Sequence, residues 1–155
     1  MKENLAPHPL GRIGLLLLVF LFAAMAPLCV LGEENLLTNG SFEELDGAGM
    51  PAGWYTDAYI KQQGYTAYGI APKGQEGGQS AYVENFGLND ARLAQRVSVE
   101  PDSVYRLSGF VRTENVADGG LGANLSVEGV YVFSPGVYGT QEEWEPVALY
   151  GRTGP

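Results

Sequence analysis

From Glu33 onward, this sequence offers carboxylates, hydroxyls, amides, aromatic rings and a few basic groups, but no thiol and no imidazole. The 155-residue sequence has one His and one Cys, and both of them, His8 and Cys29, lie before Glu33. From Glu33 onward the sequence therefore excludes zinc sites built on Cys or His. It also excludes Cys nucleophiles and any Ser-His-Asp arrangement.

Carboxylates are abundant, with 17 Asp and Glu from Glu33 onward against 7 Lys and Arg. A glycosidase needs two carboxyl groups about 5 to 10 Å apart, one of them with a raised pKa. No spacing singles out such a pair, so we predict no catalytic residues and no enzyme activity in this chain, although a longer parent protein could hold a catalytic domain. The excess of negative charge argues against a nucleic-acid partner and suits neutral polar ligands better.

Aromatic rings and arginines supply the chemistry of sugar recognition. Sugar rings pack their C–H faces on aromatic side chains, and their hydroxyls bond to arginine and other polar groups. We assign Trp54 and Trp144 to the core. Each remaining ring is individually more often a packing residue, so the hypothesis concerns the group. The candidate ligand-binding residues are Tyr59, Tyr65, Tyr68, Phe86, Arg106, Phe110, Arg112 and Tyr138.

The elements that must position these side chains are short β-strands. After residue 32 the sequence has no convincing helix, Gly is dense, and apolar residues alternate with polar ones between turn signals. This pattern is typical of an antiparallel β-sandwich. The predicted strands are Ser41–Glu44, Gly53–Tyr59, Ser80–Asn85, Arg92–Val99, Val104–Thr113, Ala123–Val132 and Glu143–Tyr150.

The clearest predicted hairpin joins Arg92–Val99 to Val104–Thr113, because the Pro-Asp step between them favours a turn. Alternation along the second strand predicts a core face and an outer face. The core face carries Tyr105, Leu107, Gly109 and Val111, and the outer face, solvated or lining a groove, carries Val104, Arg106, Ser108, Phe110 and Arg112.

The region from Ile60 to Gln79 is rich in Gly, Tyr and Gln. This composition predicts a long connection with room for one short strand. A binding loop and a flexible surface loop fit it equally well.

Residues 1–32 are typical of an export signal. Lys2 and Arg12 precede an apolar run from Ile13 to Leu31, which Pro27 interrupts. The interruption and the small-residue exit before Glu33 favour a cleaved signal peptide over a signal anchor, and either would begin as a hydrophobic helix. Because positive charge precedes the run and acidic residues follow it, we expect the rest of the chain to be secreted or held at the extracellular face of the membrane by this segment alone.

Several short segments occur in a characteristic order and spacing. They are Asn35–Glu43, Gly53-Trp54, Gly78–Val83, Leu93–Val97, then Pro101 and Tyr105–Arg112, and Gly139-Thr140 before Trp144. Together they resemble the family-four/nine type of carbohydrate-binding module, a jelly-roll β-sandwich of the galactose-binding-domain-like group. The resemblance implies that residues 33–155 form a monomeric, non-catalytic domain that binds a polysaccharide or oligosaccharide.

The same resemblance carries two further expectations. Glu43 matches a carboxylate that lies near a structural calcium ion in the family, and a chain without disulfides would gain stability from such a tie. The alternative is a solvated carboxylate at a strand end. Family members also continue to a last strand with an acidic pair, whereas this sequence stops at Pro155. We therefore expect a jelly roll truncated at its C-terminus, the N-terminal part of a larger surface or secreted protein such as a glycoside hydrolase.

A second hypothesis comes from another functional class. The chain could be a structural or adhesive extracellular β-domain without a sugar site, or the exported domain of a multi-pass membrane protein. A fold alone does not fix a function, so the sequence leaves both hypotheses open.

Overall fold

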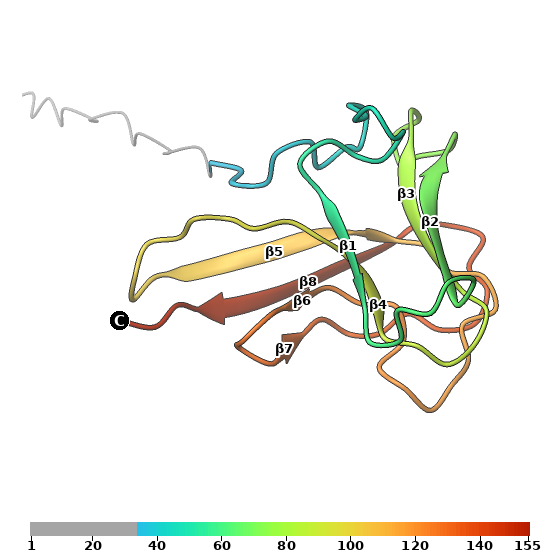
Figure 1. The fold of residues 1–155 in the computed structure, drawn as a ribbon. Coiled ribbons are helices and arrows are strands. Elements are labelled where there is room, and N and C mark those ends of the chain that lie inside the picture. The colour runs from blue at the N-terminus through green and yellow to red at the C-terminus, as the bar shows by residue number, and fades with distance from the viewer. Residues whose placement is uncertain (1–33) are drawn as a thin grey trace, which may run out of the picture. The chain divides into compact units, whose positions relative to one another are not determined.

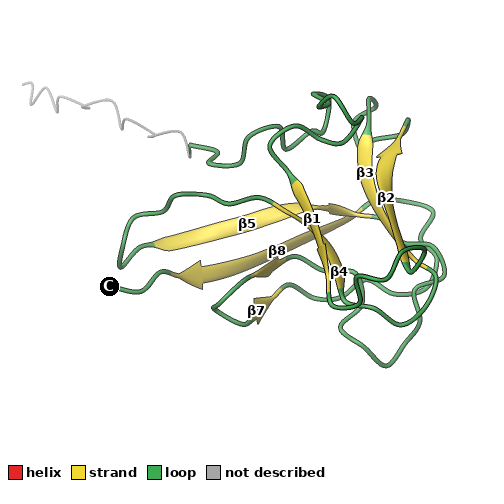
Figure 2. Ribbon diagram, viewed as in Figure 1, coloured by secondary structure: helices red, strands yellow, loops and turns green. Residues whose placement is uncertain are grey.

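The computed structural model describes residues 34–155, and every regular element within them is a β-strand. Figure 2 shows these strands joined by long loops. The predicted signal peptide or anchor and its hydrophobic helix lie outside the described residues, as do His8 and Cys29. Among residues 34–155, no helix is long and apolar enough to cross a membrane.

Eight strands form within residues 34–155, and they pair two by two, always antiparallel (Figure 1). The pairs are β1–β4, β2–β3, β5–β8 and β6–β7. Along the chain, the β2–β3 hairpin lies between β1 and β4, and the β6–β7 hairpin lies between β5 and β8. For residues 34–155 the prediction of an all-β fold with antiparallel sheets is confirmed, and the arrangement is consistent with a β-sandwich. The strands are β1 (Tyr55–Ala58), β2 (Thr66–Ala71), β3 (Ser80–Asn85), β4 (Ala91–Ala94), β5 (Val104–Val111), β6 (Ser126–Val127), β7 (Val132–Phe133) and β8 (Glu145–Arg152).

The β5–β8 pair contributes to the core through one face only. More exposed and more buried side chains alternate along β5 in the predicted phase. On the inner face Leu107 lies opposite Leu149, and Gly109 lies opposite Val147. Leu149 and Val147 are buried. The outer face of the pair is exposed to solvent, and the site described below lies on it.

Asn39 holds the turn that precedes β1. Its amide nitrogen donates to the carbonyl oxygens of Glu44 at 2.8 Å and Ala52 at 3.1 Å, and its amide oxygen accepts from the N–H of Glu44 at 3.1 Å. The backbone of Asn39 is left-handed, with φ at 49°, a conformation that asparagine tolerates better than most residues. The side chain of Asn39 therefore connects its own turn to the backbone at Glu44 and at Ala52.

Trp54 covers this turn. Its ring centroid lies 5.1 Å from that of Phe42, with the two ring planes tilted by 57°. Its Nε1 donates to the carbonyl oxygens of Thr38 and Asn39. Trp54, predicted for the core, is half-buried, and these contacts hold it against the turn.

The predicted strand Ser41–Glu44 is wrong. Ser41 ends a turn and residues 42–44 are irregular, and the next residue, Leu45, forms an isolated bridge with Pro51. Phe42 has a φ of 62°, which no extended strand contains. The side-chain bonds of Asn39 supply the reason, since they draw the backbone of Glu44 back across the turn.

The predicted hairpin between Arg92–Val99 and Val104–Thr113 is also wrong. The first strand is shorter than predicted, because β4 ends at Ala94 and pairs with β1. The second strand pairs with β8 instead.

Two polar side chains from distant segments explain this pairing. The amide of Gln95 accepts from the N–H of Thr38 at 2.8 Å and donates to its carbonyl oxygen at 2.9 Å, as a neighbouring strand would. The hydroxyl of Thr153 accepts from the N–H of Ser103 at 2.9 Å and donates to the carbonyl oxygen of Glu100 at 2.7 Å. The turn before β5 is therefore held by the segment that follows β8.

The predicted single strand Ala123–Val132 is two short strands, β6 and β7, with Val127 paired to Val132. Gly129 and Tyr131 have φ values of 83° and 53°, which reverse the chain. The Gly in the middle of the predicted strand was the turn signal.

The remaining strand predictions agree with the structure. β3 has the predicted bounds, β1 lies within Gly53–Tyr59, and β8 overlaps Glu143–Tyr150. β2 is the one short strand expected between Ile60 and Gln79.

Candidate functional site

The outer face of β5 and β8 brings three of the predicted ligand-binding residues into one row. Arg106, Phe110 and Arg112 lie at alternate positions along the strand and its extension. The antiparallel register places Arg106 directly opposite Tyr150, and Phe110 directly opposite Pro146. Phe110 is 49% exposed and Tyr150 is 65% exposed. Two rings and a guanidinium group are thus presented to solvent on a regular scaffold.

Arg112 and Trp144 close one end of this row. Continuing the register by one step puts them opposite each other, and the guanidinium carbon lies 5.2 Å from the ring centroid. Trp144, predicted for the core, is half-buried, and its Nε1 is buried with no hydrogen-bond partner among the described residues. We refer to the outer residues of this pair as the β5–β8 strip: Val104, Arg106, Ser108, Phe110, Arg112, Trp144, Pro146, Ala148, Tyr150 and Arg152.

Tyr138 lines an open hollow of about 390 Å³. Pro146 belongs to the strip and also lines this hollow, so the two adjoin. The Tyr138 hydroxyl donates to the carbonyl oxygen of Gly120 at 2.9 Å. Gly122 and Gly136 pack so closely that a Cβ on either would come within 2.9 Å of the Tyr138 side chain. The ring is therefore held in place, and the hollow also offers the side chains of Gln141 and Glu145.

The other four predicted residues belong to the β1–β4 and β2–β3 pairs and their loops. Tyr59 and Phe86 are exposed. Tyr65 is half-buried, with its ring against Gly87. The hydroxyl of Tyr68 donates to the carbonyl oxygen of Asp57 at 2.8 Å. The predicted ligand-binding residues thus divide between the strip, the hollow and this loop group.

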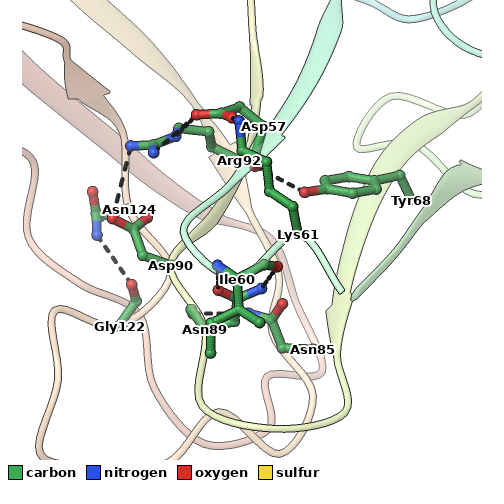
Figure 3. A network of polar contacts seen from close by, with 10 residues as sticks. All are labelled: Asp57, Ile60, Lys61, Tyr68, Asn85, Asn89, Asp90, Arg92, Gly122 and Asn124. Atoms are coloured by element: carbon green, nitrogen blue, oxygen red, sulfur yellow. Dashed lines mark hydrogen bonds and ion pairs between the residues drawn. The ribbon is translucent and has the colours of Figure 1, made fainter. Parts of the chain in front are cut away.

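Asn89 fixes the loops that carry Tyr59 and Phe86 (Figure 3). Its amide oxygen accepts from the N–H of Ile60 at 2.8 Å. Its amide nitrogen donates to the carbonyl oxygen of Ile60 at 3.0 Å and to the hydroxyl of Thr66 at 2.8 Å. The connection after β1 is therefore hydrogen-bonded to the loop before β4.

Asp57 is the centre of a small charged cluster, also drawn in Figure 3. Its carboxylate lies 2.8 Å from Lys61 Nζ and 3.0 Å from one terminal nitrogen of Arg92. The other terminal nitrogen of Arg92 lies 3.7 Å from the carboxylate of Asp90. The hydrogen bond from Lys61 holds the pKa of the Asp57 carboxyl below its ordinary value of 3.8, with smaller contributions from the charges of Lys61 and Arg92. Burial raises the pKa of the Tyr68 hydroxyl above 10.0.

The lowered pKa of Asp57 predicts a specific pH dependence. Its contribution to stability is present above pH 3.8 and is lost as the pH falls through the lower pKa of the folded state. We expect Asp57→Asn to be less stable than the wild type at neutral pH and the gap to close in acid, measured by urea unfolding. Asp118→Asn, at an exposed carboxylate outside the four ion pairs of the described residues, is the matched control. An Asp57→Asn gap that is independent of pH would contradict the role of the charge.

Glu43 lies against the Gly-rich turn before β3. One carboxylate oxygen accepts from the N–H of Gln79 at 2.8 Å, and the other from its side-chain amide at 3.3 Å. Calcium needs six to eight oxygen ligands. No group of three or more Asp, Glu, His or Cys residues suited to a metal forms within residues 34–155. The carboxylate thus has a partner in the protein itself, and calcium at Glu43 stays a prediction.

The predicted outer face lacked the five residues that the segment around β8 adds to the strip, which are Trp144, Pro146, Ala148, Tyr150 and Arg152. Two of them are aromatic rings: Tyr150, which is not among the predicted ligand-binding residues, and Trp144, which is predicted for the core. Alternation along the predicted strand Glu143–Tyr150 already puts both on one face. What the sequence lacked was the pairing of this strand with β5.

No family model matches the sequence, and neither a curated protein nor a solved structure matches it either.

Proposed function

We propose that this chain is an exported, non-catalytic carbohydrate-binding domain with the jelly-roll fold of the family-four/nine type of module. The β5–β8 strip is the binding surface. Export rests on the apolar run before Glu33 and the charges on either side of it. Nested antiparallel pairs, as in β5–β8 around β6–β7, suit the Greek-key connections from which a jelly roll is built.

The observation that carries the proposal is the cross-strand pairing of rings with arginines on an exposed face. Phe110 and Tyr150 offer flat apolar surface, and Arg106 lies directly opposite Tyr150. A sugar ring stacked on either ring would bring its hydroxyls within reach of a guanidinium group. Because both strands are paired and one face is packed, these side chains need little ordering before they bind.

The proposal predicts that changing Phe110→Ala and Arg112→Ala together weakens glycan binding about tenfold or more, since a stacking surface and a charged donor are both lost. The measurement is retention of the full-length chain on an array of neutral and acidic polysaccharides, followed by titration of each polymer that binds. Phe133→Ala with Arg96→Ala is the matched control, because it removes the same two residue types from exposed positions outside the strip.

Two results decide between the hypotheses. If the double variant binds as the wild type does while the control loses binding, the strip is not the site. If the wild type retains no glycan, the structural or adhesive β-domain is supported instead.

A further inference from the structure

The β5–β8 strip concentrates positive charge in an otherwise acidic protein. From Glu33 onward 17 acidic residues outnumber 7 basic ones, yet the strip holds Arg106, Arg112 and Arg152 and no acidic residue. Arg152 approaches the carboxylate of Asp102 beyond the end of the strip at 3.9 Å. Glu145, at the start of β8, alternates to the other face of the strand. The strip is therefore positively charged, whereas residues 33–155 taken together are negatively charged.

Arg106 and Arg112 are the two arginines of the strip without an ion pair among the described residues, and Arg96, outside the strip, also has none. Lys61 and Arg92, by contrast, are both used by Asp57. The guanidinium carbon of Arg112 lies over the Trp144 ring, 5.2 Å from its centroid, which is a cation–π contact. Such a contact leaves N–H groups of the guanidinium group free, and these match the two oxygens of a carboxylate.

The spacing of the two arginines suits a polymer. They are six residues apart on one face of an extended strand, which corresponds to about 20 Å at 3.3 Å per residue. Phe110 lies between them and offers a stacking surface. A single sugar unit cannot reach both guanidinium groups, whereas a chain of several units lying along the strand can.

We infer that the β5–β8 strip binds acidic polysaccharides, in which sugar units carry carboxylates, through Arg106 and Arg112. This inference rests on the proposed function and narrows its ligand class. The protein's overall negative charge weakens long-range attraction to any polyanion. Selectivity for carboxylate-bearing polymers therefore comes from paired hydrogen bonds between each guanidinium group and a carboxylate, with a sugar ring stacked on Phe110 between the two arginines. Nucleic acid, whose affinity depends on many phosphate contacts, is disfavoured by the same overall charge.

The test compares one polymer in two chemical states. The full-length chain is titrated with polygalacturonate and with the same polymer after its carboxylates have been reduced to alcohols. We expect the acidic form to bind about tenfold more tightly or better. The preference should persist as ionic strength rises from about 10 mM to about 150 mM. The Debye length falls from about 30 Å to about 8 Å, so salt screens the long-range repulsion between the two negatively charged partners more than the contacts at the two arginines.

Variants locate the effect. Arg106→Gln with Arg112→Gln should abolish the preference for the acidic form while leaving residual binding of the reduced form. Arg106→Lys with Arg112→Lys keeps the positive charge but loses the paired donors of the guanidinium group. This variant should retain only part of the preference for the acidic polymer. Arg96→Gln, at an arginine stacked on Tyr55 from another strand pair, should change neither polymer's binding.

The outcomes separate the two claims. Equal binding of both polymers overturns the inference and leaves carbohydrate binding standing. Binding of neither polymer, together with an empty glycan array, overturns both. Tighter binding of single-stranded DNA than of polygalacturonate overturns the inference by assigning the strip to phosphate polymers.

Discussion

Leu149→Ala should destabilise the domain by about 3 kcal/mol, within the range for deleting a buried leucine side chain. Leu149 is only 5% exposed and lies opposite Leu107 on the inner face of the β5–β8 pair. Of the four buried side chains that form the hydrophobic core of the described residues, Leu149 is the largest and the least exposed, so its truncation removes the most buried apolar surface. The measurement is the free energy of unfolding from a urea titration of the purified full-length chain.

Two control variants separate the cavity from other effects of substitution. Val104→Ala changes the same strand pair at a side chain that is 65% exposed, and it should cost less than about 0.5 kcal/mol. Leu149→Met keeps the volume and should cost less than about 1.5 kcal/mol. If Leu149→Ala proved no more costly than Val104→Ala, the inner face of the pair would not be a packed core.

Asn39→Ala should cost somewhat more, about 4 kcal/mol, for two separable reasons. The variant loses the three hydrogen bonds to Glu44 and Ala52, each with a net value of about 1 kcal/mol. It also places a Cβ without a polar side chain at a φ of 49°, which costs about 1 kcal/mol. Urea unfolding again gives the measurement.

The chain supplies a matched control for the backbone term. Asn115 also has a positive φ, of 56°, but its side chain makes no hydrogen bond among the described residues. Asn115→Ala should therefore show only the backbone cost. Asn39→Gly, which relieves the backbone, should show only the hydrogen-bond cost. Equal destabilisation by Asn39→Ala and Asn115→Ala would contradict the role given to the Asn39 amide.

Local patterns predicted the class of the fold and one face of the candidate site. Alternation identified the outer face of β5, with Arg106 and Phe110, because a strand keeps its period wherever it pairs. Patterns failed where a side chain bonds to backbone far along the chain. Gln95 and Thr153 are ordinary polar residues in the sequence, yet their bonds to Thr38 and Ser103 determine which segments meet.

The same limit applied to the ligand expected from composition. Averaged over the domain, the charge suits neutral ligands. The register of β5 with β8 gathers three of the few arginines on one face, and that register cannot be read from composition. Net charge describes the protein at long range, whereas a ligand in contact meets only the side chains of one surface.

The pairing of β5 with β8 also has a kinetic consequence. The whole β6–β7 hairpin and its flanking loops lie between the two strands, so closing this pair requires a long loop to lose entropy first. The short hairpins can form early, and the Arg106–Tyr150 neighbours should meet only in the last, slowest phase of refolding. If the chain crosses a membrane unfolded, as the export that we propose requires, the two halves of the β5–β8 strip would therefore come together only after export.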